Sequence, residues 1–219
     1  MPQRPKSVEA VVLDVGETLI DETRVWSAWA DRLAIPRLTF MAILGAAIAR
    51  GEDHHAPTRL LRPDVDIRAT MADAATQDGG WIQASDLYPD AVAGLRGLVA
   101  AGYRVGVVGN QPARSEAMLR DLGVQIELIA SSESLGAAKP DPGFFLAIAD
   151  RLRLEPSSIA YVGDRVDNDV RPAASVGMRT VFIRRGPWAW IQAGPECPPD
   201  ADVEIDSLLA LPEVLATLD

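Results

Sequence analysis

Residues 11–22 read VVLDVGETLIDE, a stretch in which an apolar run leads into polar residues. Three strand-forming residues are followed by the carboxylate of Asp14, and Gly16 and Thr18 come at alternate positions after it. An aspartate after a strand is usually a turn or helix-cap residue, but ligands also bind at the carboxyl ends of strands in open parallel sheets. The role of Asp14 therefore depends on which side chains follow the other strands.

Short apolar runs separated by helical patterns predict the fold class. The runs are rich in Val and Ile, as in parallel strands buried on both faces, and the alternation of strands and helices predicts βαβ units. We therefore expect an α/β fold, a Rossmann-like three-layer sandwich with a parallel central sheet. The predicted strands are Ala10–Leu13, Val105–Val108, Ile159–Val162, Thr180–Ile183 and, more weakly, Ala201–Ile205; the predicted helices are Asp90–Ala101, Arg114–Leu122, Pro142–Leu152, Asn168–Val176 and Ser207–Leu218.

The alternation breaks between Asp21 and Ser85, where the patterns are helical. This break predicts a core domain of residues 1–21 and 86–219 with an inserted all-α domain of residues 22–85. The polar stretch that carries His54 and His55 is interpreted as a solvated loop. The predicted helices of the insertion are Thr23–Leu33, Leu38–Arg50 and Ile67–Thr76, with a hinge at Gln77–Gly80.

Composition limits the classes of partner and the compartment. The chain has 219 residues and a net charge of −10, and an acidic surface argues against nucleic-acid binding. A single cysteine, Cys197, rules out an intrachain disulfide and favours a reducing compartment. Without an apolar leader or a run of about 20 apolar residues, we expect a cytoplasmic protein that contacts no membrane. A homodimer is a further possibility. Trp188 and Trp190, expected in a loop, could pack onto the core or meet a partner subunit.

Polar side chains follow the predicted strands at the sheet edge where ligands bind. Asp14 follows the first strand, the pair Gly109-Asn110 the second, and Asp164 another, with Asp169 five residues later. Lys139 lies before two prolines that fix the loop around it. Three clustered carboxylates repel one another unless a cation lies among them, and Mg²⁺ prefers oxygen ligands. The pattern predicts a magnesium site beside which an aspartate could attack a phosphoryl group.

The motifs DVGETL, VVGN, AKPDPGFF and YVGDRVDND occur in this order from about Val11 to Ile183. Together they resemble the four motifs of the haloacid dehalogenase-like (HAD) superfamily, and the insertion resembles its helical cap of the C1 type. The resemblance implies an Mg²⁺-dependent hydrolase of the phosphatase type that acts on a small phosphorylated metabolite. It implies that Asp14 is the nucleophile and that the cap closes over the site and selects the substrate.

The resemblance also implies the remaining roles. Lys139 would bind phosphate and orient Asp14. The metal ligands would be Asp14, Asp164, Asp169 and the backbone carbonyl of Gly16, and the phosphate-binding residues would be Gly16, Thr18, Gly109, Asn110 and Lys139.

Two positions depart from the family pattern. Gly16 replaces the second aspartate, which serves as general acid and base, and Gly109 replaces a serine or threonine that binds phosphate. A positioned acid or base contributes roughly 10²–10⁴-fold to rate, so the source of the proton becomes the open question. The candidate proton donors are Glu17 and the two histidines, although Glu17 is expected to point away from the site.

The sequence also allows three other hypotheses about function. A dehalogenase needs no acid for its halide leaving group, although the acidic GDRVDND motif suits a metal that such enzymes do not use. A non-catalytic family member could bind Mg²⁺ and a phosphate ligand or a protein partner. A receiver-type phospho-acceptor domain also uses an aspartate and a lysine, but the inserted cap disfavours it. Specificity would reside in cap residues such as Trp26, Trp29, His54 and Arg59.

Overall fold

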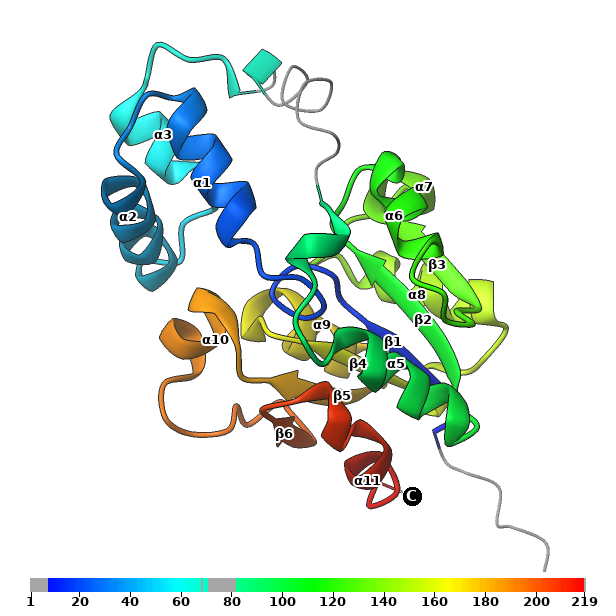
Figure 1. Cartoon of the computed structure of the whole chain (residues 1–219). Helices are drawn as coiled ribbons and strands as arrows, with labels where there is room; N and C mark the ends of the chain where they lie inside the picture. Colours follow the sequence, from blue (N-terminus) through cyan, green and yellow to red (C-terminus); the bar gives the residue numbers. More distant parts are fainter. Residues whose placement is uncertain (1–7, 68, 71–81, 219) are drawn as a thin grey trace, which may run out of the picture.

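The computed structural model describes residues 8–67, 69–70 and 82–218. Its centre is a six-stranded sheet of order β3-β2-β1-β4-β5-β6, in which every pairing is parallel. The expected α/β class is confirmed (Figure 1). The strands are β1 (Ala10–Leu13), β2 (Arg104–Gly109), β3 (Leu128–Ser131), β4 (Ile159–Gly163), β5 (Arg179–Ile183) and β6 (Val203–Ile205).

The two faces of the sheet are both covered, which explains why the strands are apolar throughout. On β1, Val11 and Leu13 join the core on one face, and Ala10 and Val12 join the core on the other. This alternation follows from the two-residue period of a strand. The first core includes side chains of α5 (Ala91–Ala100) and α11 (Leu211–Leu215), and the second includes those of α8 (Pro142–Leu152) and α9 (Arg171–Ser175).

The strand β3 was not predicted. Its sequence LIAS is short, and its first two residues are only partly buried because β3 lies at the edge of the sheet. Edge strands with one partner do not show the continuous apolar run of a central strand. The short helix α7 (Ser132–Leu135) follows it directly, and α6 (Glu116–Arg120) precedes it.

The strand order reverses at β1, which has β2 on one side and β4 on the other. In open α/β sheets this switch point is where ligands bind, beyond the carboxyl ends of the strands. Leu13 pairs with both Val107 and Val162, so Asp14 and Asp164 leave adjacent strands at nearly the same level. The topology therefore brings these two aspartates to one place.

Helices α1 (Thr23–Arg32), α2 (Arg37–Ala49) and α3 (Ala56–Leu61), here called the cap helices, lie together beyond that edge of the sheet (Figure 1). Helices α1 and α2 contribute to an apolar cluster that includes Trp29, Leu33 and Phe40. The first two helices match the predicted ranges closely. The predicted Ile67–Thr76 helix and Gln77–Gly80 hinge fall largely or wholly outside the described residues, and the division into core and cap domains stays a prediction.

The segment with Trp188 and Trp190 is a helix, so the expectation of a loop is wrong. Helix α10 (Gly186–Ala193) begins at a glycine followed by proline, a residue that is favourable in the first turn. Trp188 is buried against Leu44 and Ile48 of α2, whereas Trp190 is 60% exposed. Helix α10 thus joins the core to the cap helices.

None of the described helices is by itself long and apolar enough to cross a membrane. Helices α1 and α2 pass this test only when taken together, and they are bent by 114° relative to each other.

Candidate active site

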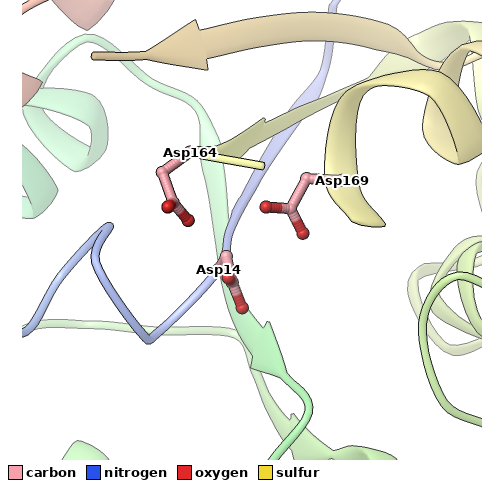
Figure 2. Close-up of side chains that lie close together, drawn as sticks. All are labelled: Asp14, Asp164 and Asp169. Atoms are coloured by element: carbon pink, nitrogen blue, oxygen red, sulfur yellow. The ribbon is translucent and has the colours of Figure 1, made fainter. Parts of the chain in front are cut away.

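Three aspartates meet at the carboxyl ends of β1 and β4. Asp14 follows β1, Asp164 follows β4, and Asp169 lies in the wide helical turn η4 (Val166–Val170). Each offers a carboxylate oxygen within 4.8 Å of the others, and Figure 2 shows the three side chains lying close together. All three are buried, so their mutual repulsion is weakly screened by solvent.

Lys139 lies between two of these carboxylates. Its Nζ is 2.6 Å from Asp14 Oδ1 and 2.6 Å from Asp169 Oδ1, and its side chain is 1% exposed. Burial by itself lowers the pKa of this lysine, but the charges of Asp14 and Asp169 outweigh burial and raise it. Lys139 is therefore a buried cation that holds the Asp14 carboxylate in a fixed orientation.

One positive charge does not balance three carboxylates. Burial raises the pKa of Asp164 well above its usual value, and the charges of Asp169 and Asp14 add to the effect. Burial likewise raises the pKa of Asp169 to about 6. Asp164 Oδ2 is buried and has no hydrogen-bond partner among the described residues. An additional cation would relieve both the repulsion and the unpaired oxygen, so the residues present fit a hard divalent ion such as Mg²⁺.

Asn110 holds the loop that carries Lys139. The Lys139 backbone N–H donates to Asn110 Oδ1 at 2.8 Å, and Asn110 Nδ2 donates to the Lys139 carbonyl at 2.9 Å. This reciprocal pair ties the end of β2 to the loop before α8. Asn110 also lines the cavity above the carboxylates, so a ligand there lies next to it.

Two of the residues predicted to bind phosphate lie behind the cavity surface. A Cβ atom added at Gly109 would lie 2.6 Å from Asp14 Oδ1, so the Asp14 carboxylate occupies the space of the missing hydroxyl side chain. Thr18 is fully buried and is not among the residues that line the cavity. Its carbonyl accepts a hydrogen bond from Arg185 at 3.1 Å, which places Thr18 in the turn after β1 as a structural residue.

The carboxylates open into a cavity of about 330 Å³ between the sheet and the cap helices. This size suits a small molecule. The sheet side contributes Asp14, Gly16, Lys139 and Asp164, whereas Trp26, Asp53 and His54 line it from the cap and Trp188 lines it from α10.

The expectation of a solvated histidine loop is wrong for His54. Helix α3 begins just after this segment and folds it back, so that His54 lies partly buried with its ring 5.7 Å from that of Trp26. Burial lowers the pKa of His54 to about 4, and the nearby His55 contributes to the decrease. His54 is therefore neutral at pH 7.

Glu17 is buried and fully engaged. Its Oε1 accepts from the Glu22 backbone N–H at 3.0 Å, and its Oε2 accepts from the Tyr88 hydroxyl at 2.6 Å. Its backbone has a φ of +50°, in the left-handed region, which shows how sharply the chain turns after Gly16. Glu17 thus braces the turn, although it also borders the cavity.

Arg165 and Glu22 also line the cavity, although the sequence pattern did not single them out. Arg165 stacks over the Trp188 ring at 5.1 Å, and its backbone N–H donates to Asp169 Oδ2 at 3.0 Å. Glu22 places its carboxylate beside Gly16, and burial, with the charges of Glu17 and Asp14, raises its pKa to about 8. Glu22 follows the glycine by six residues, a spacing that does not by itself indicate proximity.

Comparison with known proteins decides the family. The family model described as haloacid dehalogenase-like hydrolase matches residues 8–177. The chain belongs to this family. Membership agrees with the resemblance of the four motifs, and it makes the cluster of Asp14, Asp164, Asp169 and Lys139 the candidate active site.

Several curated relatives are named as phosphatases. A glyceraldehyde 3-phosphate phosphatase of Methanopyrus kandleri is 40% identical over 103 residues, covering 45% of this chain and 44% of that relative. A phosphoglycolate phosphatase of Nitrosococcus oceani is 26% identical over 230 residues, covering 96% and 98%. The chain spans about half the length of several relatives, between 42% and 57%.

Solved structures support the same fold. A HAD phosphatase from Thermococcus onnurineus superposes with a TM-score of 0.62 at 26% identity, covering 95% of this chain and 98% of that one. An L-2-haloacid dehalogenase, PA0810, superposes with a TM-score of 0.66 at 20% identity, covering 95% and 99%. At that identity the second likeness bears on the fold alone.

Proposed function

We propose that this chain is an Mg²⁺-dependent phosphatase that transfers a phosphoryl group from a small metabolite to Asp14 and then to water. One observation carries the proposal. Three buried carboxylates lie together, Lys139 pairs with only two of them, Asp14 and Asp169, and Asp164 Oδ2 has no hydrogen-bond partner among the described residues. That arrangement is unfavourable as it stands and becomes favourable when a divalent cation binds.

The residues divide the work between them. Lys139 keeps Asp14 oriented for attack, and it supplies positive charge to a bound phosphate. Asp164, Asp169, Asp14 and the carbonyl of Gly16 would hold the metal, which would neutralise charge on the transferring phosphoryl group. The Trp26 and His54 side of the cavity would exclude water from the aspartyl-phosphate until the leaving group departs.

The size of the cavity and the names of the relatives support this substrate class. About 330 Å³ suits a small phosphate ester. The relatives named above act, by their names, on glyceraldehyde 3-phosphate and phosphoglycolate, which are both small phosphorylated metabolites.

A panel of small phosphate esters, assayed by phosphate release with and without Mg²⁺, tests the proposal. We expect release that requires Mg²⁺ and is abolished by Asp14→Asn, a change that removes the nucleophile and keeps its size. Binding of Mg²⁺ with no phosphate release from any ester or acyl phosphate would favour a non-catalytic family member. Chloride release from 2-chloropropionate without metal would instead favour a dehalogenase.

A further inference from the structure

The space beside Gly16 is already filled by another side chain. A Cβ atom built on Gly16 would lie 2.7 Å from Glu22 Oε1 and 3.0 Å from Glu22 Cδ, closer than non-bonded carbon and oxygen atoms approach. The carboxyl group of Glu22 therefore occupies the volume that the first atoms of an aspartate side chain at position 16 would need. The missing acid of the family pattern is replaced in space by an acid from elsewhere in the chain.

The Glu22 carboxyl group is held in place by its other oxygen. Trp26 Nε1 donates to Glu22 Oε2 at 3.2 Å, one helical turn along α1. The indole is itself packed, with its ring 6.1 Å from Trp188 and 6.4 Å from Phe40. Among the described residues no hydrogen bond to Oε1 is found, so this oxygen is available on the side of Gly16. Glu22, Gly16 and Asp14 line the same cavity.

We propose that Glu22 is the catalytic general acid and base of this phosphatase, in the place of the aspartate that position 16 lacks. The assignment rests on the proposed function. In the first step an Asp14 oxygen bonds to phosphorus, the bond from phosphorus to the ester oxygen breaks, and that oxygen takes the proton of the Glu22 carboxylic acid. In the second step the Glu22 carboxylate takes a proton from water as the water oxygen attacks phosphorus, which releases inorganic phosphate and restores Asp14.

The other acids near the cavity are already engaged. Both carboxylate oxygens of Glu17 accept hydrogen bonds, from the Glu22 backbone and from Tyr88. Asp53 pairs with Arg59 at 2.7 Å. Glu22 alone among these three acids has an oxygen directed to the position that the family pattern assigns to the acid.

The first test is Glu22→Gln, which keeps the size and can still accept from Trp26, compared on two substrates. For an alkyl phosphate such as glycerol phosphate, whose alkoxide must be protonated, we expect kcat to fall by roughly 10²–10⁴-fold. For p-nitrophenyl phosphate, whose phenolate leaves unprotonated, we expect a much smaller decrease in the rate at which phosphoenzyme forms. Glu52→Gln, on the exposed surface of the cap, is the matched control and should leave both rates unchanged.

A merely structural role for Glu22 would slow both substrates alike. That result, or an unchanged rate on the alkyl phosphate, would overturn the assignment. Failure of the proposed function looks different: the wild-type protein would release no phosphate from any ester, or its turnover would survive Asp14→Asn. If only the assignment of Glu22 is wrong, the wild-type protein is active and Asp14→Asn is inactive.

The second test exchanges the two positions. Gly16→Asp alone should give no gain, because its side chain would compete with the Glu22 carboxyl group for one volume. Gly16→Asp combined with Glu22→Ser should have at least ten times the alkyl-phosphate activity of Glu22→Ser alone. A tenfold gain in activity from Gly16→Asp with Glu22 intact would refute the claim that Glu22 replaces an acid at position 16. No recovery of activity in the double variant would refute it as well.

Discussion

Gly163 is the position where a single added methyl group should disable the proposed metal site. A Cβ atom at Gly163 would lie 2.5 Å from Cβ, Cγ and Oδ2 of Asp169. Asp169 cannot easily yield, because it is fully buried and accepts hydrogen bonds from Lys139 at 2.6 Å and from the Arg165 backbone at 3.0 Å. Gly163→Ala must therefore displace either the carboxylate or the strand.

The destabilisation expected for Gly163→Ala has a lower and an upper limit. Overpacking of a core site costs typically about 1–3 kcal/mol. For a chain of this size each kcal/mol lowers Tm by about 2–4 °C, so we expect a decrease of about 2–12 °C without metal. A ligand at a hundred times its Kd raises the free energy of unfolding by about 2.7 kcal/mol. We expect Mg²⁺ to stabilise the wild-type protein by about this amount, and we expect Gly163→Ala to lose most of that stabilisation.

Differential scanning fluorimetry with and without Mg²⁺ measures both effects without relying on turnover. The matched control is Gly45→Ala in α2, where the nearest atom to an added Cβ is Ile191 Cδ1 at 3.8 Å. Alanine is favoured over glycine in a helix by up to about 1 kcal/mol, so this variant should keep or slightly raise Tm and keep the metal effect. A Gly163→Ala protein with wild-type Tm and wild-type response to Mg²⁺ would refute the reasoning.

Two titratable groups outside the carboxylate cluster give predictions about pH dependence. Burial alone would raise the pKa of Asp90, but hydrogen bonds from Arg185 and Ser207 outweigh it and lower the pKa to about 2 from an ordinary 3.8. Asp90→Asn should therefore lower the free energy of unfolding by at most about 2 kcal/mol near pH 7, and urea titrations should show the deficit vanish as pH falls from 4 toward 2. His54 should titrate near pH 4 by NMR, so that the stability from its neutral packing is full above pH 6.5 and is lost as pH falls toward 4; a midpoint near 6.5 would contradict its burial.

The strands and the acidic cluster could be predicted from the sequence because burial leaves a local pattern. Strands such as β1 and β4, covered on both faces, are apolar without interruption, and their carboxyl ends must lie together in a parallel sheet. Edge strand β3 lacks that pattern, and it was missed. The aromatic segment around Trp188 was misjudged for a related reason: its burial depends on α2, which is distant in sequence.

The relation between Gly16 and Glu22 could not be predicted from sequence. It depends on the tight turn after β1, in which the backbone N–H groups of Leu19 and Ile20 both donate to the Val15 carbonyl. That turn brings the first residue of the cap back over the glycine. Which side chain fills a missing position is a question of three-dimensional packing, whereas the missing position itself is visible in the motif.

The most direct measurement of the central claim is chemical trapping of the intermediate on Asp14. The wild-type protein, turning over a phosphate ester in the presence of Mg²⁺, is quenched in acid, reduced with borohydride and digested for mass spectrometry. An aspartyl-phosphate is reduced to homoserine, so the peptide that contains residue 14 should carry homoserine there, and omission of the ester should abolish the product. Steady phosphate release with Asp14 unmodified in every trapped sample would contradict the claim that Asp14 is the nucleophile.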